Sequence, residues 1–153
     1  MNHELQQRIK DAALDSDALR ALRYRFAYEC ANRVRHLLEE PRAVELLDVL
    51  HAFVDGRSDE AALTSAADEA AHVANHHRGS ASIDGTQHSA VSATYAVAKA
   101  LAGKALEAAE YAAYSTVYGY GVYAVNDPDS FAPEYGWQVN ALEELLTAQT
   151  VTH

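Results

Sequence analysis

Apolar residues recur every three or four positions along almost the whole chain, which is the period of an α-helix with one buried face. The clearest stripe comprises Leu19, Leu22, Phe26, Cys30, Val34 and Leu37. It follows Asp15-Ser16-Asp17, a favourable helix start, and predicts one long helix over 17–39. A shorter amphipathic segment before it predicts a lead helix over 4–14.

Proline, glycine and capping residues divide the rest of the chain into further helices. Pro41 suits the first turn of a helix, and Asp55-Gly56 suits its end. Because this helix begins directly after the predicted helix over 17–39, we expect a very tight link between the two. Ser58, followed by Asp59 and Glu60, caps the next helix and places carboxylates at the positive end of its dipole. The expected helices are 41–55, 58–77, 89–102, 104–124 and 135–148, with polar loops at 78–86 and 126–133.

No part of the sequence alternates with the period of two that marks a strand, so we expect no β-sheet. A chain of 153 residues can bury one core without a covalent staple, and we expect a single domain over 1–153. Tight links between helices favour antiparallel neighbours. The prediction is an all-α fold of about six to seven helices, either an antiparallel multi-helix bundle or a short α-solenoid, which periodicity alone does not distinguish.

The formal net charge of −10 is unevenly distributed along the chain. Residues 1–42 carry eight Lys/Arg and seven Asp/Glu, whereas residues 43–153 carry four and fifteen. A surface so poor in cations repels phosphate backbones, which argues against direct nucleic-acid binding. The same field attracts a basic protein and speeds its association, although acidity also serves solubility alone.

The chain has one cysteine, and no charged-then-apolar leader precedes its first amphipathic segment. Its apolar stretches are interrupted well before the ~18 consecutive apolar residues that a membrane span requires. We therefore expect a cytoplasmic protein that does not enter the membrane. Cys30 falls on an apolar stripe, and neither Arg33 nor Arg35 lies one turn away on that face, so we expect a structural thiol.

A His-x-x-x-His pair is the best candidate for a metal site. Asp68, His72 and His76 stand four residues apart on one face, and this spacing lets a single helix offer two imidazoles to Zn²⁺. With His88 from the following loop, they suggest a metal-dependent helical enzyme. The His-Glu-x-x-His motif and a second Glu-x-x-His element are absent, however. A solvated polar face is the competing interpretation, and the prediction is that the protein has no cofactor.

Tyrosines gather between residues 111 and 123. Tyr111, Tyr114 and Tyr118 share one helix face, and Tyr120 and Tyr123 lie on another. Tyrosine gives a large contact area at small entropic cost, which suits an interface anchor. In an alanine-rich core, the same rings also serve to fill the space between helices.

Six short blocks of the sequence carry a family resemblance. The first four are Glu29-Cys30-Ala31-Asn32-Arg33-Val34, Leu37-Leu38-Glu39, Pro41-Arg42-Ala43-Val44 and Ala52-Phe53-Val54-Asp55-Gly56. The last two are Ala70-Ala71-His72-Val73-Ala74 and Ala108-Ala109-Glu110-Tyr111-Ala112-Ala113. Together they resemble a family of immunity proteins from bacterial polymorphic toxin systems. The resemblance implies a small cytoplasmic antitoxin that binds and blocks a cognate toxin, and it implies no catalytic residues.

The leading hypothesis is therefore an immunity-type binding protein, not an enzyme, that neutralises a cognate basic toxin domain by occlusion. Its expected contact residues are Asp55, Asp59, Glu60, Asp68, Tyr114 and Tyr118. One alternative is the metal-dependent enzyme that uses His72 and His76. Another is an acidic interaction module of a phage or mobile element. The sequence leaves open whether an alanine and tyrosine face also forms a homodimer.

Overall fold

The computed structural model describes residues 1–77 and 86–152, and these contain seven α-helices and no strand, which confirms the predicted all-α fold. The helices are α1 (His3–Ala12), α2 (Arg20–Arg33), α3 (Pro41–Val54), α4 (Glu60–His76), α5 (Thr86–Leu101), α6 (Ala105–Tyr118) and α7 (Ala132–Thr152). Short 3-10 turns occupy Asp17–Leu19, Arg35–Leu37, Val122–Asn126 and Pro128–Phe131. Among the described residues, no helix is both long and apolar enough to cross a membrane.

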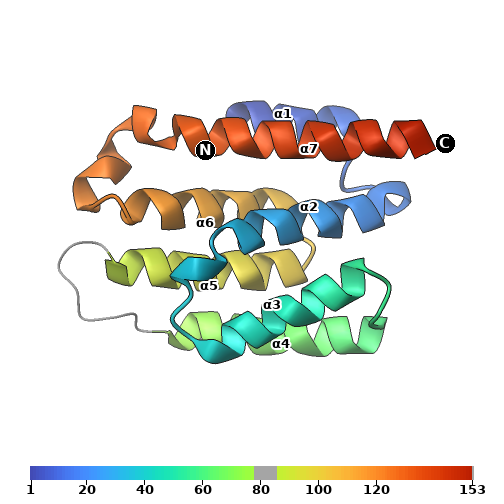
Figure 1. The fold of residues 1–153 in the computed structure, drawn as a ribbon, viewed down its shortest axis with the longest axis horizontal. Coiled ribbons are helices and arrows are strands. Elements are labelled where there is room, and N and C mark those ends of the chain that lie inside the picture. The colour runs from blue at the N-terminus through green and yellow to red at the C-terminus, as the bar shows by residue number, and fades with distance from the viewer. Residues whose placement is uncertain (78–85, 153) are drawn as a thin grey trace.

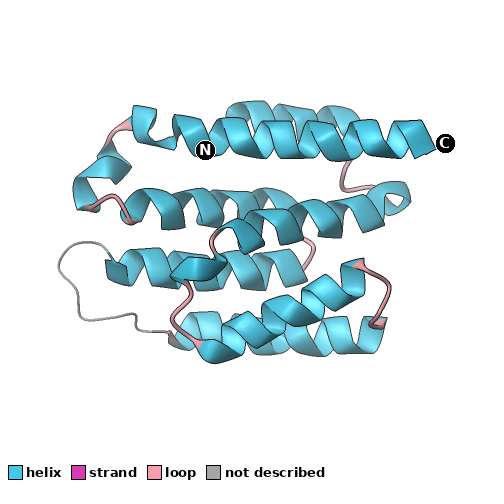
Figure 2. Cartoon of the chain, viewed as in Figure 1, coloured by secondary structure: helices cyan, strands magenta, loops and turns pink. Residues whose placement is uncertain are grey.

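The helices form two layers (Figures 1 and 2). One layer consists of α7, α2 and α3, and the other consists of α1, α6, α5 and α4. Helix α2 lies over both α5 and α6, and these two helices form an antiparallel pair joined by a short link. The central position of α5 and α6 means that every other long helix packs on at least one of them.

One continuous core holds the two layers together, and it takes buried side chains from all seven helices. Its members include Leu5, Phe26, Leu47, Leu63, Val97, Ala109 and Leu142. On α5 and α6 most buried positions are alanine, which lets the two backbones approach closely. Because one core is shared throughout, the architecture is a helical bundle rather than a solenoid of stacked repeats.

Several helix ends follow directly from the capping residues in the sequence. Pro41 occupies the first turn of α3, as predicted. Gly56, with a φ of 76°, ends that helix, and its amide donates to the Phe53 carbonyl at 3.0 Å. The cap of α4 is Asp59 rather than Ser58, because the Asp59 carboxylate accepts from the Ala62 amide at 2.8 Å.

The predicted helix over 17–39 is wrong in its extent. A 3-10 turn precedes α2, and α2 ends at Arg33, where Val34 leaves the helical region with φ −109° and ψ 15°. Val34 is completely buried, and the chain turns around it toward α3. Arg35 fixes this turn because its guanidinium donates to both carboxylate oxygens of Asp48 on α3, at 2.8 and 3.2 Å. Tertiary packing thus ends a helix whose apolar period continues. The link to α3 covers residues 34–40, so the tight link predicted between these two helices is wrong.

The predicted helix over 104–124 is also too long. Helix α6 ends at Tyr118, and Gly121 adopts a φ of 117°, a conformation that glycine adopts readily. Helix α7 begins at Ala132, earlier than the predicted 135, after a turn in which the Asp127 carboxylate accepts from the Asp129 amide. Of the predicted loop at 78–86, residues 78–85 lie outside the described residues and Thr86 begins α5.

Candidate partner-binding surface

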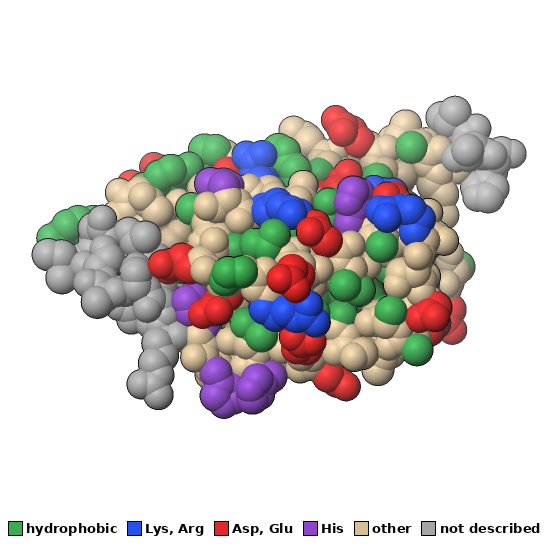
Figure 3. Space-filling view, turned by 60° about the horizontal axis from the view of Figure 1, so that its bottom comes forward, with side chains coloured by type: hydrophobic (Ala, Val, Ile, Leu, Met, Phe, Trp, Pro, Cys, Tyr) green, Lys and Arg blue, Asp and Glu red, His purple; other side chains and the backbone are tan. Residues whose placement is uncertain are grey.

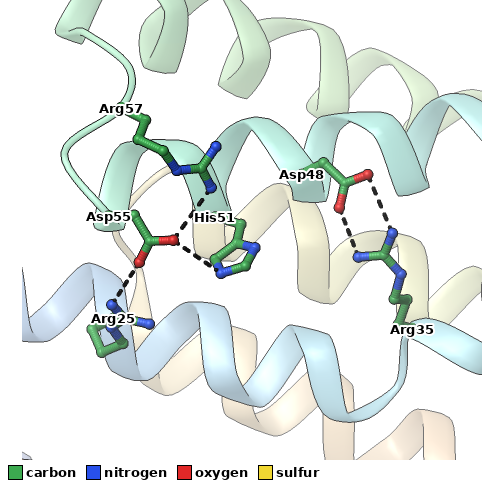
Figure 4. A network of polar contacts seen from close by, with 6 residues as sticks. All are labelled: Arg25, Arg35, Asp48, His51, Asp55 and Arg57. Atoms are coloured by element: carbon green, nitrogen blue, oxygen red, sulfur yellow. Dashed lines mark hydrogen bonds and ion pairs between the residues drawn. The ribbon is translucent and has the colours of Figure 1, made fainter.

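Asp55, predicted to contact a partner, lies at the centre of an ion-pair network between α2 and α3 (Figure 4). Its carboxylate accepts from Arg25 at 3.0 Å and from Arg57 at 3.2 Å, and it lies 3.2 Å from Nε2 of His51. The hydrogen bonds from Arg57 and then Arg25 hold the pKa of Asp55 below its ordinary value. The carboxylate is therefore already compensated within the chain.

The other predicted acidic residues have different environments. Glu60 forms a two-pronged bond to Arg20 of α2, with distances of 2.6 and 2.9 Å. Asp59 is occupied as the cap of α4. Asp68 lies on the exposed face of α4 and makes no ion pair with any described residue.

Arginine side chains are almost all neutralised within the molecule. In the described part of the chain, each arginine except Arg23 forms an ion pair with at least one carboxylate. The pairs are Arg8 with Glu4 and Glu143, Arg20 with Glu60, Arg25 and Arg57 with Asp55, Arg33 with Glu134, Arg35 with Asp48, and Arg42 with Glu45 and Glu69. Figure 3 shows blue and red side chains interleaved on one face of the bundle.

Carboxylates are left over once these pairs are formed. Exposed carboxylates with no ion pair to the described residues include Asp15, Asp17, Glu39, Asp68, Asp129 and Glu144. The arginines of α2 thus bond within their own chain. Among the described residues, the exposed carboxylates without an ion pair outnumber the exposed unpaired lysines, Lys10 and Lys104, so the charge that remains available to a partner is predominantly negative.

The histidine pair does not assemble a metal site in the part of the chain that the structure describes. His72 and His76 are exposed with ring centroids 4.1 Å apart, and Nδ1 of His76 lies 2.8 Å from the His72 carbonyl oxygen. No group of three or more His, Cys, Asp or Glu residues suited to a metal occurs among the described residues. His88 instead lies against the Tyr118 ring, with centroids 5.1 Å apart.

Cys30 is completely buried in the core, as predicted from its place on the apolar stripe. Burial, with a smaller contribution from Glu29, raises the pKa of its thiol far above the ordinary value. A protonated, inaccessible thiol is a packing group and not a nucleophile.

Large exposed apolar side chains converge on one end of the bundle. Within the described residues they are Met1, Tyr114, Tyr120, Val122 and Tyr123, with exposed fractions of 54, 37, 65, 43 and 89%. Four of them belong to the end of α6 and the turn that follows, and Met1 shares a hollow with Tyr114. Tyr118, the other predicted contact residue, is half-buried beside Tyr114 with ring centroids 6.1 Å apart.

Two hollows flank Tyr114, which forms a wall of each. The first measures about 220 Å³ and is lined by Met1, Tyr114, Val125, Pro128, Phe131 and Tyr135. The second measures about 370 Å³ and is lined by Lys99, Glu107, Glu110, Tyr111 and Tyr114. Together with the exposed tyrosines, these hollows give an uneven aromatic surface bordered by charge, which we call the Tyr114 surface.

The charged side chains of the second hollow differ in whether they have a bonding partner. Lys99 lies 3.3 Å from a carboxylate oxygen of Glu107. In contrast, Oε1 of Glu110 is buried and has no hydrogen-bond partner among the described residues. Leaving a buried acceptor unsatisfied typically costs about 1–3 kcal/mol, and more for a charged group. Burial raises the pKa of the neighbouring Tyr135, and electrostatic interactions with Tyr114 and Glu110 raise it further.

Buried polar bonds make the frame around these hollows rigid. The hydroxyl of Ser89 on α5 donates to the Ser115 carbonyl on α6, and the Ser115 hydroxyl donates to the Ser89 carbonyl, both at 2.6 Å. Gln138 of α7 donates to the Ala109 carbonyl at 2.8 Å and accepts from the Asn2 amide at 3.1 Å. These bonds tie the N-terminus, α5 and α7 to the helix that carries Tyr114.

The predicted contact residues do not form one surface. The C-terminal end of α6, which carries Tyr114 and Tyr118, lies at one end of the bundle, and the α3–α4 connection with Asp55, Asp59 and Glu60 lies at the other (Figure 1). The sequence interpretation also missed the partners of Tyr114. Phe131 packs edge-on against the Tyr114 ring at 5.2 Å and neighbours Tyr135, but only the fold brings these segments together.

Comparison of the chain with protein-family models, curated proteins and solved structures finds no match.

Proposed function

We propose that this chain is an immunity-type binding protein that docks a basic partner protein, of the toxin class, on the Tyr114 surface and blocks it. The observation that carries the proposal is the convergence of the large exposed apolar side chains of the described residues on this one end. Contiguous apolar surface rimmed by polar groups marks interaction sites, and tyrosines are frequent among the residues that dominate binding energy.

Charge supports a basic partner. The net charge is −10, and Arg20, Arg25 and Arg33 of α2 are held by carboxylates of their own chain. Asp129 lies exposed in the turn beside Phe131. A basic protein approaching this end meets the uncompensated carboxylate of Asp129. Among the described residues, Arg23 is the one arginine without a carboxylate partner, and its guanidinium donates to the Leu14 and Ser16 carbonyls. Such complementarity speeds association and selects against acidic partners.

The metal-dependent enzyme has less support. Its two histidines lie on an exposed face, and the described residues supply no third ligand beside them. An acidic module of a phage or mobile element predicts the same charge and the same aromatic surface as an immunity protein, so the identity of the partner has to separate the two.

An affinity pull-down from the native host tests the proposal. The baits are the wild type, a Tyr120→Ser/Tyr123→Ser variant, and an Arg57→Ser control at the opposite end of the bundle. All three substituted side chains are well exposed, so we expect the fold to be retained. We expect one basic protein in stoichiometric amount with the wild type and the control, and its loss with the tyrosine variant.

The same samples decide between the alternatives. Neutralisation is tested by co-expressing the captured protein with each bait and following growth, which the wild type should restore and the tyrosine variant should not. Capture that is independent of the two tyrosines would contradict the Tyr114 surface. A bait that retains one equivalent of zinc or iron and captures no protein would favour the enzyme that uses His72 and His76.

Salt dependence tests the electrostatic part separately. Once a partner is purified, its association rate should fall steeply as the ionic strength rises, because exposed charges more than about 10 Å apart are screened at 0.1 M salt. An association rate that does not change with salt would remove this part of the proposal and leave the aromatic contact untouched.

A further inference from the structure

We propose that the hollow around Glu110 is the anchor site for one arginine side chain of the partner, whose guanidinium pairs with Glu110 and lies against Tyr111 and Tyr114. This inference rests on the proposed function for its biological occupant. Its chemistry, however, belongs to the described residues alone and can be tested without any partner.

The carboxylate of Glu110 is the group that requires a donor. It lines the hollow, and its Oε1 atom is buried with no hydrogen-bond partner among the described residues. The two other charges of the hollow, on Lys99 and Glu107, lie 3.3 Å apart and compensate each other. A single added cation that pairs with the Glu110 carboxylate therefore makes the hollow neutral.

The aromatic walls are held in place before any ligand arrives. The Tyr111 ring stacks on Tyr95 with centroids 5.2 Å apart, and the Tyr95 hydroxyl donates to Asn75 at 2.9 Å. On the other side, Tyr114 packs edge-on against the buried Phe131. A preformed pair of rings accepts a flat cation with little loss of conformational freedom.

The same combination of an arginine, a carboxylate and an aromatic ring occurs twice within the described residues. Arg33 lies over the Trp137 ring at 4.4 Å and binds Glu134 with two nitrogens. Arg20 lies over the Tyr24 ring at 4.9 Å and binds Glu60 in the same way. Glu110 has the carboxylate and the rings, but no described arginine completes the set.

Guanidinium fits this hollow better than the other available cations. Its planar fork matches a carboxylate and stacks on aromatic rings, whereas an ammonium is a compact point charge that holds its water more strongly. A metal ion would require several ligands, and the described residues contain no group of three suited to one.

Titration of the ¹⁵N-labelled protein with Nα-acetyl-arginine methylamide tests the site directly. The matched probe is the corresponding citrulline derivative, which has the same shape and no charge. We expect weak, saturable chemical-shift changes for the amides of residues 107–114 with the arginine probe. Binding should be on the order of tenfold weaker with citrulline, since its uncharged group cannot form the charge-assisted bond to Glu110. Equal binding of the two probes, tighter binding of the lysine derivative, or shifts confined to other regions would overturn the inference.

Two variants separate the local carboxylate from the general negative field. Glu110→Gln keeps the side-chain shape and should weaken arginine binding about tenfold. Glu39→Gln removes an equal charge from the exposed link between α2 and α3 and should leave arginine binding within about twofold. A thermal melt of each variant confirms folding. Unchanged affinity in folded Glu110→Gln would overturn the inference, yet leave the pull-down result for the Tyr114 surface standing. Conversely, if the titration shows arginine binding but the pull-down captures no partner, the arginine site is supported and the proposed function is contradicted.

Discussion

Replacing Arg33 by methionine should destabilise the protein strongly, because it leaves a buried carboxylate without its ion-pair partner. Glu134, at the start of α7, is 5% exposed, and the Arg33 nitrogens lie 2.8 and 3.1 Å from its two oxygens. The hydrogen bond to Glu134 raises the pKa of Arg33. The same guanidinium also covers the Trp137 ring, so one side chain joins α2 to α7 by two interactions.

The size of the effect follows from the burial of each partner. Removing one member of a buried ion pair typically costs about 3–5 kcal/mol. Because the Arg33 side chain is 36% exposed, water reaches this pair, and we expect the lower end, ~3 kcal/mol. For a domain of this size each kcal/mol lowers Tm by about 2–4 °C, which gives a fall of roughly 6–12 °C.

A double-mutant cycle in urea, followed by circular dichroism, measures this coupling. Glu134→Gln alone should cost less than Arg33→Met, since it removes the buried charge and leaves Arg33 partly in water. The double variant should be little worse than Arg33→Met, with a coupling of at least about 1.5 kcal/mol. A loss below about 1 kcal/mol for Arg33→Met, or strictly additive effects, would refute the view that this pair fixes α7 on α2.

Three further predictions follow from buried bonds, backbone conformation and charge. Ser89→Ala should cost about 1–2 kcal/mol, and adding Ser115→Ala should cost less than a second independent loss, since the two hydroxyls form one reciprocal unit; additive urea midpoints would contradict this. Gly103→Ala should lower Tm clearly, because φ is +74° and a Cβ there would lie 2.8 Å from the Tyr24 hydroxyl; an unchanged melt would exclude that strain. Asp55 has a lowered pKa, so its contribution is present above its unfolded pKa of about 3.9 and is lost as the pH falls through the folded value. The difference in urea midpoint between wild type and Asp55→Asn should therefore close in acid, and a difference that persists at low pH would contradict the assignment.

Local signals in the sequence are sufficient for the helices and many of their ends. The apolar period identifies the segments that become α1 to α7, and Pro41 and Gly56 act through their own backbone geometry, independently of the rest of the fold. For this reason the all-α class and the two ends of α3 could be predicted without tertiary information.

Helix ends that are imposed by tertiary packing could not be predicted from local signals. Leu37 continues the apolar period of α2 beyond Val34, yet the chain turns there to place α3 on the core and to pair Arg35 with Asp48. Periodicity reports which residues are buried and not where the axis of the helix must change.

The candidate site, too, could be predicted from the sequence only in part. Tyr114 and Tyr118 stand out in the sequence because they are large apolar residues one turn apart. Their neighbours Met1 and Phe131 come from distant segments, and the unsatisfied oxygen of Glu110 is a property of packing alone. Likewise, the sequence shows the excess of acid but not which carboxylates are already used by arginines of the same chain.

We expect Tyr114 to anchor the basic partner, and calorimetric titration of the purified partner into wild type and Tyr114→Ala measures its contribution to binding. Tyr114 is 37% exposed and forms a wall of both hollows, so its truncation should cost at least about 2 kcal/mol of binding, roughly thirtyfold in Kd. Arg57→Ser, at the opposite end, should bind like the wild type. A Tyr114→Ala variant that remains folded and binds within about 0.5 kcal/mol of the wild type would show that Tyr114 is not the anchor.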